Sequence, residues 1–450
     1  MTYPVATSPE MNTCSVRTAS RHQRRFRPVR REQVGEAGRP WRWAAVAAGI
    51  CTAAACGTDP PAAATVEVKP DSVTLVAFRQ TVQLVARVLD RDDAPILGAA
   101  VTWSSADATV ATVDPAGLVT AVGDGETTVT ATAGAATGDV HLTARDERAA
   151  LVAFFEATNG DGWIIGDGWG TDRALREWFG VSVNERGHVV GLRLPDNQLS
   201  GSLPPELGKL GSLDFLYLHS NQLSGPIPPE LGDLVALRIL SLHGNELSGS
   251  LPAALGDLGS VADLFLGHNR LTGPIPSELG DLQSLTSLRL EYNELTGSIP
   301  PELGRLDSLT SLWLASNELT GAIPPELADL ELLTSLDLSG NWLNEVIPAE
   351  LGGLDMLRTL RLGNNELSGS IPAALGDIDS LGILGLARNE LTGALPPELA
   401  NPASLTELGA RNNRLEGCIP QALQRFRILI NPQGDPEEVD AQYDLPDCDG

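Results

Sequence analysis

The chain has 450 residues, a formal net charge of −27 at pH 7 and a sequence pI of about 4.5. A chain of this length is expected to form several domains. The acidic excess excludes a surface built to bind nucleic-acid backbones, because such surfaces need clustered Lys and Arg. No nucleic-acid partner is therefore predicted.

Residues 1–56 have the pattern of an export signal. They contain nine Arg and three Glu, and a short apolar run from Trp43 to Ala55 follows the basic part. A basic segment, about a dozen apolar residues and then small residues are typical of a bacterial export signal. The apolar run is too short for a transmembrane helix.

The end of this signal leaves two alternatives open. Ala53-Ala-Ala-Cys56-Gly resembles a lipoprotein cleavage box, which implies lipidation of Cys56, although Ala53 stands where Leu is usual. Ordinary signal cleavage after Ala55 is the alternative, and palmitate labelling of a Cys56→Ala variant distinguishes the two. In either case we expect an exported protein, at the cell surface or outside the cell. The only membrane contact expected is through a lipid on Cys56, in the first alternative.

A Pro/Ala linker at residues 57–64 leads into a β-rich segment at residues 65–146. Short runs of alternating apolar and polar residues, separated by turn signals such as Asp114-Pro-Ala-Gly117, predict an all-β sandwich of about seven strands. The stretch VTWSSADATVATVDPAGLVTAVGDGETTVTATA at residues 101–133 resembles the bacterial immunoglobulin-like group 2 domain. The resemblance implies a spacer or adhesion module with Trp103 in its core.

Residues 189–417 contain ten copies of a 24-residue repeat, and each copy is marked by an asparagine at the same position. A Leu follows each marker asparagine by two places, and a Pro follows it by seven. The asparagines are Asn197, Asn221, Asn245, Asn269, Asn293, Asn317, Asn341, Asn365, Asn389 and Asn413. Self-similarity at a fixed period of this length predicts a solenoid.

Each copy predicts its own local structure. The L-x-L motif before the asparagine alternates with period two and predicts a short strand with one buried face. The asparagine side chain can bond the backbone of the turn and of the next coil. The P-P-E-L-G motif predicts a short helix or 3₁₀ segment, opened by Pro and closed by Gly.

These residues resemble the plant-type leucine-rich repeat, LxxLxxLxLxxNxLxGxIPxxLGxLxx. The resemblance implies an α/β leucine-rich repeat solenoid with a parallel concave sheet and short convex helices or 3₁₀ turns, preceded by the immunoglobulin-like sandwich. It also implies binding of a protein or another ligand, and rarely catalysis.

The open ends of a solenoid need caps. Residues 147–188 are rich in aromatic side chains, and Trp178-Phe-Gly-Val181 resembles the N-terminal cap of bacterial leucine-rich repeat proteins. Residues 418–450 are predicted to form the C-terminal cap. Two cysteines that bracket a terminal segment of an exported protein predict a disulfide between Cys418 and Cys448.

No catalytic constellation is present in the sequence. HExxH, GxSxG and P-loop motifs are absent. His219 and His243 share a column of the repeat but lack carboxylate or Cys partners, so no metal or cofactor site is predicted.

The concave face is the better candidate site. The middle residue of each L-x-L motif should face solvent there, and this column holds aromatic and Arg side chains with the composition of binding hot spots. The predicted ligand-binding residues are Tyr217, Phe265, Arg289, Trp313 and Arg361, with Tyr292 beside them. The alternative is an unselected surface that carries occasional aromatics.

The sequence therefore predicts a monomeric, non-catalytic recognition protein that binds a protein or glycan partner on its concave face. The first alternative is a structural adhesion or matrix component without one specific ligand. An enzyme is the least favoured alternative, because no acid–base pair is evident.

Overall fold

The computed structural model describes residues 62–75, 79–123, 125–426 and 445–448. The predicted export signal, with Cys56, lies outside these residues and stays a prediction from the sequence. The described chain contains an immunoglobulin-like domain and a leucine-rich repeat solenoid, and each is described here by itself.

The part of the immunoglobulin-like domain that the structure describes contains nine strands. Its sheets have the orders β2-β9-β8-β5, β3-β7-β6 and β1-β4. Alternate residues of the strands are buried, among them Val88, Val119 and Val140, and Trp103 packs partly buried against this core. The strands are β1 (Thr65–Lys69), β2 (Ser72–Leu75), β3 (Thr81–Gln83), β4 (Val85–Leu89), β5 (Thr102–Ser105), β6 (Ala111–Val113), β7 (Leu118–Ala121), β8 (Gly125–Ala133) and β9 (Ala136–Ala144).

The main sheet of the solenoid has eleven strands, one for each repeat plus one from the N-terminal cap. The cap strand β10 pairs antiparallel with β11, and every later pair is parallel with equivalent residues opposite each other, as in Leu288 and Leu312. The strands are β10 (Val181–Val183), β11 (Val189–Arg193), β13 (Phe215–Tyr217), β15 (Ile239–Ser241), β17 (Asp263–Phe265), β19 (Ser287–Arg289), β21 (Ser311–Trp313), β23 (Ser335–Asp337), β25 (Thr359–Arg361), β26 (Ile383–Gly385) and β28 (Glu407–Gly409).

A second sheet runs along the side of the solenoid and ends at the irregular repeat of Asn341. It contains β12 (Ser200–Ser202), β14 (Gln222–Gly225), β16 (Glu246–Ser250), β18 (Arg270–Gly273), β20 (Glu294–Gly297), β22 (Glu318–Gly321) and β24 (Trp342–Leu343). After β24 only the bridges Val346–Ser368 and Ser370–Thr392 and the pair β27 (Thr392–Gly393) with β29 (Arg414–Leu415) continue it. Glu345 replaces the glycine that bends the other repeats with positive φ, which accounts for the interruption.

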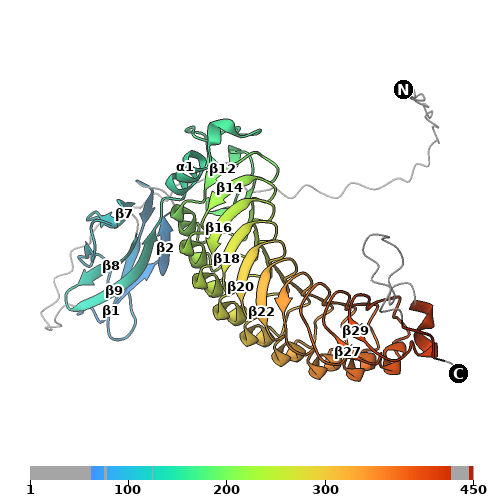
Figure 1. Ribbon diagram of the computed structural model, residues 1–450. Coiled ribbons are helices and arrows are strands. Elements are labelled where there is room, and N and C mark those ends of the chain that lie inside the picture. The colour runs from blue at the N-terminus through green and yellow to red at the C-terminus, as the bar shows by residue number, and fades with distance from the viewer. Residues whose placement is uncertain (1–61, 76–78, 124, 427–444, 449–450) are drawn as a thin grey trace, which may run out of the picture. The chain divides into compact units, whose positions relative to one another are not determined.

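Short 3₁₀ segments complete each coil and lie along the outer side of the solenoid's curve (Figure 1). Each begins after a proline in extended conformation, as after Pro300, and its leucine is buried. The segments are η3 (Pro205–Lys209), η4 (Pro229–Asp233), η5 (Ala253–Asp257), η6 (Ser277–Asp281), η7 (Pro301–Arg305), η8 (Pro325–Asp329), η9 (Ala349–Gly353), η10 (Ala373–Asp377) and η11 (Pro397–Ala400).

The glycine in most of these segments allows the outer sides of neighbouring coils to approach closely. A Cβ atom at Gly280 or Gly304 would meet the backbone oxygen of Glu302 or Glu326 in the next coil, closer than real Cβ contacts. The segments η8 and η11 carry Ala328 and Ala400 instead.

A ladder of asparagine side chains joins the coils. In the repeat of Asn293, Nδ2 donates to the carbonyl oxygens of Leu266, in the preceding coil, and of Leu290, in its own coil, at 3.1 and 3.0 Å. Its Oδ1 accepts from the amide nitrogen of Leu271 at 3.0 Å. The same set of bonds recurs at the marker asparagines from Asn221 to Asn413, so each side chain satisfies backbone groups of two coils.

The N-terminal cap closes this ladder and the leucine core. Asn197 has no preceding repeat, and it bonds the backbone nitrogen and oxygen of Ile165 at 2.8 and 2.9 Å. The cap consists of α1 (Glu147–Ala157), η1 (Gly160–Gly162) and η2 (Leu175–Glu177). Its aromatic cluster contains Phe154, Trp163, Trp169 and Trp178, with neighbouring ring centroids about 5 to 6 Å apart.

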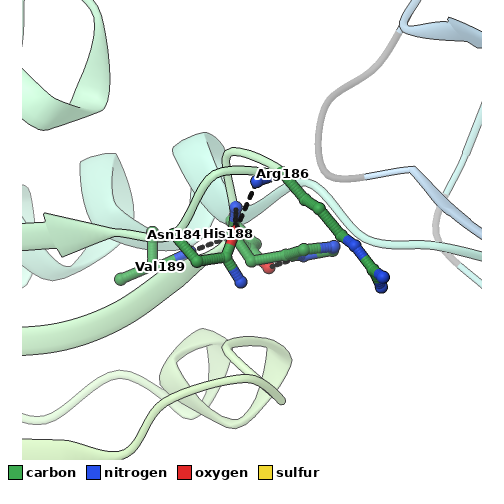
Figure 2. Close-up of polar contacts among 5 residues, drawn as sticks. Asn184, Arg186, His188 and Val189 are labelled. Atoms are coloured by element: carbon green, nitrogen blue, oxygen red, sulfur yellow. Dashed lines mark hydrogen bonds and ion pairs between the residues drawn. The ribbon is translucent and has the colours of Figure 1, made fainter.

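A tight turn connects β10 to β11 beside this cap. Figure 2 shows Asn184, whose Oδ1 accepts from the amide nitrogens of Arg186 and His188 at 2.9 and 3.1 Å. The buried Glu147 carboxylate accepts from the Val189 nitrogen at 2.7 Å and lies 3.1 Å from His188 Nδ1. Burial raises the pKa of Glu147, and these two contacts oppose that rise.

The C-terminal cap is held by η12 (Gln421–Phe426) and a covalent link. Leu423 and Phe426 are buried, and Ile419 forms a bridge with Asp447. The structure joins Cys418 and Cys448 by a disulfide. A link across 30 residues of sequence is expected to stabilise the fold by about 3 kcal/mol through the entropy of the unfolded chain.

We expect Asn293→Ala to lower the free energy of unfolding of the solenoid by on the order of 3 kcal/mol, because three buried backbone groups lose their side-chain partner. Urea unfolding measures the loss, and amide hydrogen exchange localises it to residues 266–295. The control is Glu294→Ala, an exposed neighbour, for which a change below about 0.5 kcal/mol is expected. Equal stability of the two variants would contradict the role of the ladder.

Candidate functional site

The candidate site lies on the outward side of the main sheet, where the middle residues of the L-x-L motifs form one column. The flanking leucines are fully buried, so the alternate residues point away from the core. Parallel pairing places Phe265 opposite Arg289 and Arg289 opposite Trp313. The column reads Arg193, Tyr217, Ser241, Phe265, Arg289, Trp313, Asp337, Arg361, Gly385 and Gly409.

At the centre of the column, the Arg289 side chain lies between two aromatic rings. Its guanidinium carbon is 5.2 Å from the Phe265 ring centroid and 4.5 Å from the Trp313 ring centroid. Both distances suit cation–π attraction, which contributes about 0.5 to 2 kcal/mol for each pair. The structure therefore brings three of the predicted residues into one stack.

Tyr217 belongs to a second aromatic group nearer the N-terminal cap. Arg193 lies over its ring at 5.2 Å, and the rings of Phe215 and His219 are 5.5 and 6.4 Å away. His219 in turn stacks on His243 at 4.5 Å. Burial lowers the pKa of His243, and electrostatic repulsion from the neighbouring His219 adds to this effect.

Arg361 and Tyr292 lie at the edges of this face. Arg361 is 3.8 Å from the Asp337 carboxylate, which also accepts hydrogen bonds from the backbone nitrogen and hydroxyl of Ser339. Tyr292 follows its strand in a turn with positive φ, is 54% exposed and stacks on His268 at 4.3 Å. It therefore flanks the column and is not part of it.

Glu291 is a member of this site that the sequence analysis missed. It is only 8% exposed, and a Cβ added at Gly267 would lie 2.9 Å from its carboxyl carbon. Burial raises the pKa of Glu291, while Arg289 and His268 oppose the rise. The equivalent positions of other repeats hold His219, His243, Gly267, Ala315, Ser339 and Gly363. A carboxylate between Gly267 and Ala315 was therefore the feature of the sequence that could have identified this residue.

Within the described ranges, no group of three or more His, Cys, Asp or Glu side chains is placed to hold a metal ion. The face offers aromatic rings, a guanidinium and carboxylates side by side. Such a surface can bind a ligand by stacking, hydrogen bonds and charge.

Comparison with protein families gives two kinds of match. The bacterial Ig-like domain (group 2) family matches residues 62–144. Leucine rich repeat families match residues 212–234 and the overlapping segments 235–295, 283–343 and 307–367. These matches indicate no family of enzymes. Comparison with curated proteins found no match.

Several solved structures are similar to the chain. A plant ice-binding protein is 31% identical, with a TM-score of 0.56 over 67% of this chain and 97% of that one. The ectodomain of the Arabidopsis receptor kinase HAESA, in complex with an extended IDA peptide hormone, is 31% identical, with a TM-score of 0.53 over 62% of this chain and 48% of that one. HAESA with IDA and the co-receptor SERK1 is 30% identical, with a TM-score of 0.50 over 64% and 53%. The chain thus spans about half the length of these receptor ectodomains.

None of the helices in the part of the chain that the structure describes is both long enough and apolar enough to span a membrane.

The raised pKa of Glu291 predicts a pH-dependent effect of Glu291→Gln on stability. In the folded state the carboxyl binds its proton more tightly than in the unfolded state, so ionisation costs stability as pH rises above the unfolded pKa of about 4.3. The Gln variant should therefore unfold at higher urea concentration than the native protein at about pH 7, and the difference should vanish towards about pH 4. Glu294→Gln on the exposed side of the same coil is the control. A difference that is constant across this range would contradict the assignment.

Proposed function

The chain belongs to the leucine-rich repeat proteins, with a bacterial immunoglobulin-like group 2 domain before the repeats, and we propose that it is a non-catalytic recognition protein. Its concave face binds a segment of a protein partner outside the cell. The observation that carries the proposal is the stack of Phe265, Arg289 and Trp313 on adjacent strands.

The composition of this stack supports a binding role. Trp, Tyr and Arg are the residues most enriched at energetic centres of protein interfaces. The rings present large rigid surfaces, and the flanking Arg193–Tyr217 pair extends the face towards the N-terminal cap. Two similar solved structures, both of HAESA, are complexes with the peptide hormone IDA, which agrees with a protein or peptide ligand for this face.

Export fits this proposal. The basic and apolar leader at residues 1–56 has the pattern of an export signal. One of the similar receptor structures is an ectodomain of a receptor kinase. A glycan partner and a matrix role without a single ligand are the competing interpretations, and a saturable protein partner distinguishes them from recognition.

We expect Trp313→Ala and Arg289→Ala each to weaken binding of a purified protein partner by about tenfold or more, because truncation removes the centre of the stack. Isothermal titration calorimetry with the full chain measures the change. The matched control is Glu326→Ala, an exposed residue of η8 on the outer side, for which an unchanged affinity is expected. A loss of less than about tenfold in both variants would remove this stack from the binding surface.

A second candidate function is binding to ice. It is favoured by a hydroxyl repeated once per coil along the second sheet, and by the similarity to a plant ice-binding protein over nearly all of that chain. The hydroxyls belong to Ser200, Ser224, Ser248, Thr272, Thr296 and Thr320. A periodic row of hydroxyls suits a crystalline surface, but the adjacent Arg270–Glu246 ion pair at 3.1 Å interrupts it with charge, so protein recognition is preferred.

Ice recrystallisation in the presence of the full chain tests this second candidate. If the hydroxyl row binds ice, the chain slows recrystallisation, and Thr296→Asp abolishes the effect because a hydrated charge disrupts the row. Trp313→Ala on the main sheet should leave the effect unchanged. Unimpeded crystal growth with the native chain would dismiss the candidate.

A further inference from the structure

The concave face of the solenoid is divided along its length into an aromatic part and a basic part. Coil 1 contains Asn197 and coil 10 contains Asn413, and the seven residues before each marker asparagine form a strand segment with its turn. Every Phe, Tyr and Trp of these strand segments belongs to coils 2 to 6. These residues are Phe215, Tyr217, Phe265, Tyr292 and Trp313.

The charged residues are divided in a similar way. The strand segments of coils 8 to 10 contain four arginines and one acidic residue, Glu407, whereas those of coils 1 to 7 contain three arginines and five acidic residues. The four arginines are Arg358, Arg361, Arg388 and Arg411. The chain as a whole has a formal charge of −27, so an excess of positive charge at one end of one face is a local feature.

The backbone beside these arginines carries no side chain at the centre of the strands. Gly385 and Gly409 occupy the position that Trp313 has in coil 6. A Cβ atom added at Gly409 would meet no other atom within 4 Å, and one added at Gly385 would lie 3.7 Å from Cγ of Arg361. The surface of coils 9 and 10 therefore leaves space for another chain to approach the sheet next to Arg361.

The guanidinium groups of this basic part can still form hydrogen bonds with a ligand. Arg361 is 3.8 Å from the Asp337 carboxylate, which is too far for a hydrogen bond. The Asp337 carboxylate instead accepts from the backbone nitrogen and hydroxyl of Ser339 at 3.0 and 2.6 Å. Arg411 is exposed, and its side chain forms no ion pair within the described ranges.

We propose that coils 8 to 10 bind Asp or Glu side chains of the same protein segment that contacts the aromatic part of the face. The inference rests on the proposed function and names the chemistry of the partner. Carboxylates match guanidinium groups in charge and in hydrogen-bond geometry. A basic segment would be repelled by the arginines, and an apolar segment would cover their charges without offering them a partner.

The sheet also sets the spacing of the two kinds of residue in the bound segment. Arg361 lies two strands beyond Trp313, and Arg411 belongs to the coil four strands beyond it. Neighbouring strands are about 4.8 Å apart, so these separations are about 10 and 19 Å. An extended chain advances about 3.4 Å per residue, so the acidic residues should lie about three to six positions from the residue that contacts Trp313.

Selection of a displayed random peptide library on the full chain, at about 0.05 M salt, tests the proposal. We expect enriched peptides to carry Asp or Glu about three to six positions from an aromatic or apolar residue. A selected peptide is then synthesised with an amidated C-terminus, so that only side chains supply carboxylates. Exchange of its acidic residues for Asn or Gln should weaken binding by about tenfold, and the difference should shrink at about 0.5 M salt because exposed charges are screened.

Variants of the protein locate this contact. Arg361→Gln and Arg411→Gln together should weaken binding of the acidic peptide by about tenfold, and they should leave binding of the neutral peptide unchanged, because the two changes remove the same interaction. The control is Arg305→Gln, which removes an exposed positive charge from η7 on the outer side and should not change the affinity. Circular dichroism of each variant checks that the fold is kept.

Four outcomes would overturn the inference, and they are distinguishable from one another. Binding that needs Trp313 but is unchanged by Arg361→Gln and Arg411→Gln, or selected peptides without an acidic preference, would reject the acidic contact and retain the proposed function. Peptides whose binding is also insensitive to Trp313→Ala would reject both. Heparin binding that depends on the two arginines, without peptide binding, would replace the protein segment by an anionic glycan. Failure of the library to yield any peptide, without heparin binding, would reject a linear segment as the ligand.

Discussion

The solenoid depends on the hydrogen bonds of one asparagine side chain in each coil. Each carboxamide satisfies backbone groups of its own coil and of the preceding one, so it sets the distance between coils as well as the turn after the strand. Leucine burial drives the coils together but does not specify their register, because hydrophobic contacts are not directional. Directional bonds at every coil supply that register. At the N-terminal cap, the backbone of Ile165 takes the place of a preceding coil and forms these hydrogen bonds with Asn197.

The regular register places side chains of neighbouring coils one above another on the main sheet. Phe265, Arg289 and Trp313 form a stack because the same position of three successive coils lies in one column. The carboxylate of Glu291 fits beside them because Gly267 leaves room for it. The column on the main sheet is thus a consequence of the repeat, and the residues that distinguish the proposed binding face occupy the few positions that the repeat motif does not fix.

The repeat, the short strands and the candidate column could be predicted from the sequence, because period and alternation define which residues share a face. Two features could not. The position of Arg289 between two rings depends on a side-chain rotamer, which a repeat pattern does not contain. The burial of Glu291 depends on the small neighbour Gly267 in the preceding coil, although a carboxylate in a column with several small residues was a visible sign.

The glycines of the 3₁₀ segments have a consequence for the radius of the spiral. On the outer side of the solenoid, neighbouring coils can approach only as closely as the side chains between them allow. At most coils the residue at this contact is a glycine, which has no side chain. Ala328 inserts a methyl group into that contact. The bend of the solenoid therefore depends on this position in each coil. Exchange of alanine and glycine there would change the curvature of the concave face without altering any residue that lines it.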